Sequence, residues 1–192
     1  MSKLQADLHV LTVMAEGMAD YLRADALFGK TSGRVPKLTL GGYLMRQHRL
    51  LALQALLTPA EQAEMAQAVA QYKAAVDEAI VRSEERATQE CHARLRQWEE
   101  TIRDLRRDGR AHASYYPTAA EPRAMLSQLI QMLATPPYQL DPTIPERLAL
   151  LDTGLRGVWD DGEFIWPAEW QPAYPQASYW WLYGQPSAVR TY

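Results

Sequence analysis

The sequence predicts an all-α protein, an antiparallel helical bundle around one long central helix, with an irregular aromatic and proline-rich C-terminal tail packed on it. Three observations lead to this class. Apolar residues recur at helical spacing over most of residues 1–158, helix-start signatures precede two of these segments, and the interval 60–108 lacks glycine and proline. The 192 residues, 47% hydrophobic and 22% charged, have the composition of a soluble globular domain, and we expect the tail, residues 159–192, not to fold independently.

The first predicted helix covers residues 3–28, because apolar side chains step by three and four positions from Leu4 to Ala26 and share one face. Residues 29–42, which contain four glycines, predict a loop. A second helix is expected over residues 40–57, with Thr39 as its N-cap.

The long central helix is predicted to begin at Thr58-Pro59-Ala60-Glu61, which combines a capping hydroxyl, a proline at the first helical position and a glutamate that completes a capping box. A helix from there to Asp108 would be about 75 Å long, against a diameter of about 42 Å for a compact globule of this length. We therefore expect it to protrude, to pair with another chain as a coiled coil, or to break. The polar stretch 82–90 is interpreted as the solvated middle of the helix, and a hinge or a polar pairing seam there is the alternative.

Two further helices are predicted, the first from Thr118 or Glu121 to Ala134. The second begins at Thr143, which precedes Pro145 as a cap, and ends near Gly154 or Gly157. In residues 158–166 an Asp-Gly pair lies between aromatic and β-branched neighbours, which predicts a short β-hairpin.

The tail is acidic and aromatic: ten of its 34 residues are Phe, Tyr or Trp. Such a segment exposes a large apolar area unless it docks on something. Docking on the chain's own helices is the favoured interpretation; a partner subunit, another protein and an aromatic ligand platform are the alternatives. The candidates for partner binding are Trp166, Trp170, Trp180 and Trp181.

Between Asp25 and Glu61 there is no acidic residue. A glycine-rich loop followed by a helix N-terminus offers free backbone N–H groups, so this segment could hold a phosphate, a carboxylate or a nucleic acid. The alternative is a basic rim that pairs with the acidic tail or with glutamates of the long helix. The candidate anion-binding residues are Lys30, Arg34, Lys37, Arg46 and Arg49.

The stretch from Arg107 to His112 is similar to the Arg-polar-three-residues-His motif of HEPN ribonucleases, an all-helical family. The resemblance implies that His112 acts in chemistry at the 2′-hydroxyl and that Arg107 holds the scissile phosphate. The alternative is a helix C-terminus whose arginines complement the helix dipole.

No other chemistry is indicated. The four histidines lie on different predicted segments without the usual ligand spacings, so we expect no metal and no cofactor. A single cysteine, Cys91, excludes a disulfide framework and lies on an apolar stripe, as a buried structural thiol would. We expect a cytoplasmic protein without a membrane segment, since no apolar run is long enough to cross a bilayer.

The favoured functional hypothesis is a non-enzymatic helical interaction or scaffold protein that forms a homodimer through the long helix and the tail. The first alternative is an anion- or nucleic-acid-binding module that uses the basic segment 30–49. An HEPN-like ribonuclease is the third hypothesis. Whether the tail docks within its own chain or on another chain is left open by the sequence.

Overall fold

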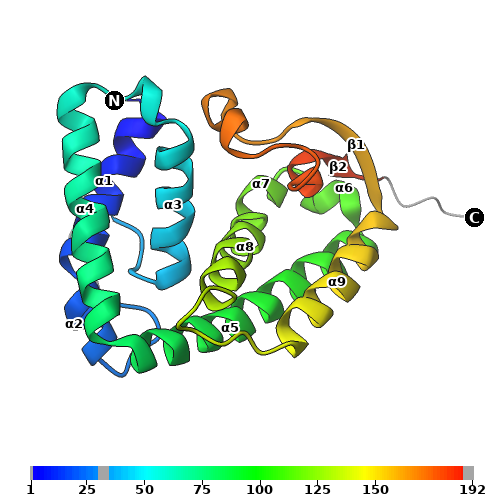
Figure 1. The fold of residues 1–192 in the computed structure, drawn as a ribbon. Helices are drawn as coiled ribbons and strands as arrows, with labels where there is room; N and C mark the ends of the chain where they lie inside the picture. Colours follow the sequence, from blue (N-terminus) through cyan, green and yellow to red (C-terminus); the bar gives the residue numbers. More distant parts are fainter. Residues whose placement is uncertain (1, 30–34, 188–192) are drawn as a thin grey trace, which may run out of the picture.

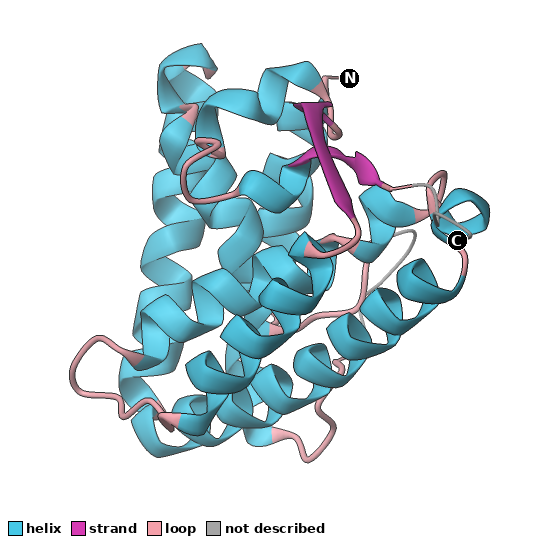
Figure 2. Ribbon diagram, turned by 90° about the vertical axis from the view of Figure 1, so that its right-hand side faces the viewer, coloured by secondary structure: helices cyan, strands magenta, loops and turns pink. Residues whose placement is uncertain are grey.

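The structure is a computed structural model that describes residues 2–29 and 35–187. It is mostly helical with a small two-stranded sheet (Figure 2), which confirms the predicted mainly-α class. The α-helices are α1 (Lys3–Glu16), α2 (Met18–Arg23), α3 (Leu40–Ala52), α4 (Pro59–Glu78), α5 (Ile80–Arg107), α6 (Gly109–His112), α7 (Tyr116–Ala119), α8 (Glu121–Leu133) and α9 (Thr143–Arg156). The shorter elements are the 3-10 helices η1 (Gln54–Leu56), η2 (Ala168–Ala173) and η3 (Trp180–Leu182), and the strands β1 (Trp159–Phe164) and β2 (Tyr183–Pro186).

Helix α3 joins two groups of helices. It packs against α1 on one side and against α8 and α5 on the other, while α4 covers α1 and α9 covers α5 (Figure 1). Their apolar faces form one buried cluster that extends through both groups. The two groups therefore share a core, with α3 at its centre.

The first predicted helix is divided at Gly17 and ends early. α1 buries the predicted face, including Leu4, Leu8 and Leu11, and α2 ends at Arg23 rather than at residue 28. The Ser2 and Gln5 side chains complete a capping box at the start of α1 that the sequence analysis did not identify.

The predicted long central helix is two helices, α4 and α5, that meet at Ala79, where φ is −129° and ψ is 47°. In Figure 1 α5 turns away from α4 at this point, so no single long helix lies at the centre of the molecule. The cause is tertiary packing, because α4 packs on α1 and α2 whereas α5 packs on α8 and α9. The capping box at Thr58 is present as predicted.

The break lies at Ala79, so the hinge considered as the alternative for residues 82–90 is wrong. Residues 82–90 lie within α5, and polar side chains among them form hydrogen bonds with other parts of the chain. Arg82 and Arg86 donate to the carbonyl oxygen of Ala24, just after the last residue of α2. The polar stretch is therefore a contact surface between helices and not a weak point of one.

Helix α3 ends at Ala52, five residues before the predicted end, and is followed by η1, whereas the ends of α8 and α9 agree with the sequence to within three residues. Thr39 caps α3 by accepting a hydrogen bond from the backbone N–H of Gly42. Thr143 is the first residue of α9 and not its cap; its backbone N–H donates to the Asp141 carboxylate, 2.9 Å away.

The predicted hairpin over residues 158–166 is also wrong. Those residues contain β1, which pairs antiparallel with β2, so that Trp159 lies opposite Pro186 and Phe164 lies opposite Tyr183. The Asp-Gly pair is inside the strand and makes no turn. Residues 165–182, which we call the aromatic strap, leave the sheet and return to it, and they bury rings that a local hairpin would leave exposed.

None of the described helices is long and apolar enough to cross a membrane.

Candidate functional site

An open groove of about 500 Å³ lies between α3, α4 and α8 and is bordered by the loop that follows α8. Its volume is within the range of about 300–1,000 Å³ that is usual for ligand pockets. The exposed side chains beside it include Leu51, 45% exposed, and the prolines Pro136 and Pro137. The groove is therefore lined in part by apolar side chains that are exposed to solvent.

Helical periodicity explains why these residues meet. Residues spaced three and four positions apart share a helix face, and each of the three segments contributes one such set. The set is Leu44, Gln47, His48 and Leu51 from α3, Tyr72, Lys73, Val76 and Asp77 from α4, and Gln128, Gln131, Met132 and Thr135 from α8 and the residues after it. The polar side chains that α3, α8 and the residues after α8 contribute are three amides, one hydroxyl and one imidazole. These groups form hydrogen bonds with a ligand without carrying a full charge.

His48 links the groove to the aromatic strap. Its Nε2 atom lies 2.7 Å from the carbonyl oxygen of Ala173 and 3.4 Å from the hydroxyl of Tyr179. A carbonyl only accepts, so Nε2 carries the hydrogen and Nδ1 keeps a lone pair. Burial lowers the pKa of His48 and the neighbouring Arg49 lowers it further, against the opposing effect of the Ala173 hydrogen bond. The imidazole is therefore neutral at pH 7.

The charges of the groove lie on its rim. Lys73 and Asp77 are one turn apart on α4, are both exposed, and form an ion pair with each other. Across from them, Gln128 donates a hydrogen bond to the Tyr179 hydroxyl, 3.1 Å away. This arrangement suits an apolar or neutral polar surface, and Asp77, the carboxylate among the described lining residues, is paired with Lys73.

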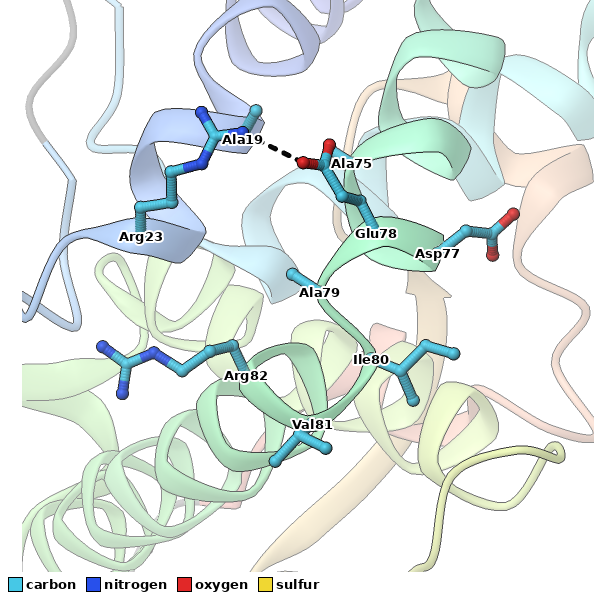
Figure 3. A pocket seen from close by; sticks show the side chains of 9 residues that line it. All are labelled: Ala19, Arg23, Ala75, Asp77, Glu78, Ala79, Ile80, Val81 and Arg82. Carbon is cyan, nitrogen blue, oxygen red and sulfur yellow. Dashed lines mark hydrogen bonds and ion pairs between the residues drawn. The ribbon is translucent and has the colours of Figure 1, made fainter.

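A second open groove, of about 520 Å³, lies where α4 meets α5. In Figure 3 Arg23 and Glu78 point toward each other across it, and their charged atoms are 3.3 Å apart. Val81, 71% exposed, lies on its border. Asp77 lines both grooves, which places them on either side of the last turn of α4.

Of the described members of the predicted anion-binding set, Arg46 and Arg49 lie together and Lys37 lies apart from them. Lys37 is exposed, whereas Arg46 and Arg49 are buried against the single carboxylate of Asp7, at 3.6 and 3.1 Å. Arg49 also donates to the Tyr174 hydroxyl at 2.8 Å, and it lies over the Trp170 ring at 3.7 Å. The other two members, Lys30 and Arg34, lie outside the described residues.

The N–H groups that the start of α3 offers to an anion bind carboxylate and hydroxyl groups of the chain itself. The backbone N–H of Gly41 donates to Glu90, which has no exposed surface, at 2.9 Å. Arg94, one turn further along α5, holds the other Glu90 oxygen at 2.9 Å. Sequence analysis missed Glu90 because a glutamate inside a polar stretch is typical of a solvated face; its spacing of four from Arg94 was the available signal.

The two residues of the HEPN-like motif lie at the end of α5 and in α6. Arg107 is exposed and donates to Asp104, one turn earlier, at 3.0 Å. His112 lines a cavity of about 40 Å³ together with Asp104, Tyr115 and Tyr116. A space of this size holds about one water molecule and is too small for a phosphodiester.

The tryptophans of the tail dock on the same chain. Trp166 and Trp181 are buried, and Trp170 and Trp180 are half-buried. The Trp166 ring N–H donates to the Pro117 carbonyl at 2.7 Å, and Trp181 contacts Trp98 with ring centroids 6.3 Å apart. The Arg156 guanidinium lies over the Trp180 ring, with its central carbon 3.5 Å from the ring centroid.

Among the described residues no group of three or more His, Cys, Asp or Glu side chains is placed to hold a metal ion. Cys91 is buried, and burial raises the pKa of its thiol to about 12, with the Glu90 carboxylate adding to the effect. A thiol in this state is a poor nucleophile at neutral pH.

No family model, no curated protein and no solved structure matches the chain. The geometry described above is therefore the basis for a functional proposal.

Proposed function

We propose that the protein is a non-enzymatic helical scaffold protein that forms a homodimer through the groove between α3, α4 and α8 and its border. We call this surface the groove face, and its projecting residues are Leu51, Lys73, Asp77, Pro136 and Pro137. The observation that carries the proposal is that an open groove is lined in part by exposed apolar side chains, among them Leu51, Pro136 and Pro137.

A two-fold interface needs a surface that is complementary to itself, because the same patch is used by both copies. On the groove face Leu51 and the two prolines can enter the groove of a second copy, and the reverse contact forms at the same time. Lys73 and Asp77 carry opposite charges on the rim, so an antiparallel approach brings unlike charges together. The neutral amides of the groove can be buried at a lower cost than charged groups.

The use of the buried ionisable groups supports a non-enzymatic role. Asp7 pairs with two arginines, Glu90 pairs with Arg94, and Asp152 accepts from Arg123 at 2.8 Å and from the Trp98 ring N–H at 3.1 Å. Each of these carboxylates joins helices and is not directed into the groove between α3, α4 and α8. The two alternative functions, anion binding by the segment 30–49 and RNA cleavage by Arg107 and His112, stay predictions, as does a cytoplasmic location.

The proposal is tested by the mass of the full chain in solution, measured by sedimentation velocity over a range of concentrations. We expect the wild type to dimerise and Leu51→Lys to raise the dissociation constant at least tenfold, since a charge at a buried contact leaves the partner surface unsatisfied. Leu150→Lys is the matched control, because Leu150 on α9 is 75% exposed and does not line the groove. A wild type that is monomeric at every concentration, or equal effects of the two variants, would contradict the proposal.

A further inference from the structure

Two neighbouring side chains of α3 hold the aromatic strap. Arg49 donates to the Tyr174 hydroxyl at 2.8 Å, and the Nε2 atom of His48 donates to the Ala173 carbonyl at 2.7 Å. The rings of Tyr174 and Tyr179 pack beside the imidazole, with centroids 5.4 and 5.8 Å away. Of these groups only His48 ordinarily changes its charge near neutral pH.

Among the described residues, no carboxylate is placed against the His48 imidazole to balance a positive charge. From α3 it meets the Arg49 guanidinium, and from the strap it meets the Ala173 carbonyl and two tyrosine rings. From α8, the Gln128 amide donates a hydrogen bond to the Tyr179 hydroxyl. From α4, Tyr72 lines the groove, and the Lys73–Asp77 ion pair lies on its rim.

The nearby carboxylates already have cationic partners. Asp77 is paired with Lys73, and Asp7 is paired with Arg46 and Arg49. A positive charge on His48 would thus be a second cation beside Arg49 in a half-buried site.

We propose that His48 makes the docking of the aromatic strap on α3 sensitive to pH, so that acidification releases the strap. When the strap leaves, the imidazole gains access to water and takes up a proton easily. When the strap is docked, it buries the imidazole and disfavours the same proton, and the Ala173 hydrogen bond offsets this only in part; Arg49 lies on the same helix as His48 and is present in both states. This inference rests on the strap contacts and does not depend on self-association.

The sign follows from linkage. Docking holds the pKa of His48 below its ordinary value of about 6.5, so the undocked state binds more protons once the pH falls below 6.5. Docking is therefore strongest above pH 6.5. It weakens by up to tenfold per pH unit as the pH falls from 6.5 toward the lowered pKa of the docked state, because one proton is taken up.

Hydrogen exchange of the full chain, followed by mass spectrometry between pH 7.5 and 5.5, tests the proposal. The strap contains suitable amides, since Tyr174 N–H donates to Gln171 and Tyr179 N–H donates to Pro175, both at 3.0 Å. After correction for intrinsic rates, we expect strap protection in the wild type to fall below pH 6.5 by up to tenfold per pH unit. In His48→Gln it should stay constant, because the amide still donates to Ala173 but does not titrate.

His9→Gln is the control, since His9 is exposed on α1 and this variant should behave as the wild type. Peptides from α5 serve as an internal reference for global unfolding. If the His48 variant does not fold, an NMR titration of the His48 ring in the wild type tests the proposal instead. We expect a pKa below 6.5 for His48. Four results overturn the proposal: constant wild-type protection, an equal fall in His48→Gln, an equal fall in α5, or a His48 pKa at or above 6.5.

Discussion

Glu90 is a residue whose role depends on contacts far along the chain. Its two carboxylate oxygens bond to the start of α3 and to Arg94, so one side chain joins α5 to α3 and neutralises a buried cation. Such a group is costly to bury and is stable only when both oxygens find partners. Its place in a polar run predicted exposure, and nothing local in the sequence indicates that α3 begins beside it.

The close approach at Gly41 gives a prediction at the residue scale. A Cβ atom there would lie 2.8 Å from Glu90 Oε1 and 3.0 Å from side-chain atoms of Met125 and Leu129. We expect Gly41→Ala to lower the free energy of unfolding by about 1–3 kcal/mol, because overpacking outweighs the better helix propensity of alanine. Urea unfolding followed by circular dichroism measures this.

Gly154→Ala in α9 is the matched control for Gly41→Ala. A Cβ atom at Gly154 would meet only the Arg106 side chain and Ile102, at 3.6 to 3.7 Å, which is ordinary contact. This variant should be neutral or more stable by up to about 1 kcal/mol. Equal stabilisation by the two substitutions would show that the packing around Gly41 is not as described.

At the scale of elements, the sequence predicts helices well where local signals determine them. Thr39 and Thr58 act as caps as predicted, and the apolar spacing identifies the buried faces of α1 and α4. The break at Ala79 has no glycine or proline and is set by which helices α4 and α5 pack against. The pairing of β1 with β2 joins residues 19 to 27 positions apart, so an Asp-Gly pair inside β1 gave a misleading local signal.

The strand pairing depends on Gly184, which has φ of +135° and lies against the Asp160 carbonyl. A Cβ atom at Gly184 would lie 2.1 Å from that oxygen, so Gly184→Ala combines backbone strain with a collision. We expect unfolding free energy to fall by at least about 2 kcal/mol, with loss of amide protection in β1. Gly157→Ala, which has an ordinary φ of −67°, should change neither measurement by as much.

At the scale of the whole molecule, the aromatic tail closes the fold of its own chain. Trp166 and Trp181 are buried between helices, and the strap covers the end of α3 through His48 and Arg49. Composition predicts that these rings must dock, but the sequence does not determine where, because that depends on the surface formed by α3, α7 and α8 together. Substituting these tryptophans would therefore disturb folding as well as any assembly.

The docking of the aromatic strap on α3 also explains why the candidate site could not be predicted in full from the sequence. The basic residues of α3 that the sequence analysis grouped as an anion site include Arg46 and Arg49, which the fold uses to hold Asp7 and the strap. The groove face went unnoticed because its members come from three segments and form no motif. Its only trace in the sequence is the repeated spacing of three and four positions within each helix.

Isotope-filtered NOE spectroscopy on a mixture of labelled and unlabelled chains tests whether two copies meet through the groove face, as we claim. At concentrations where sedimentation gives a dimer, we expect intermolecular NOEs from the methyl groups of Leu44 and Leu51 to Tyr138 and the prolines beside it. Intermolecular NOEs confined to α9 around Leu150 or to the tail, or a chain that stays monomeric, would contradict the claim.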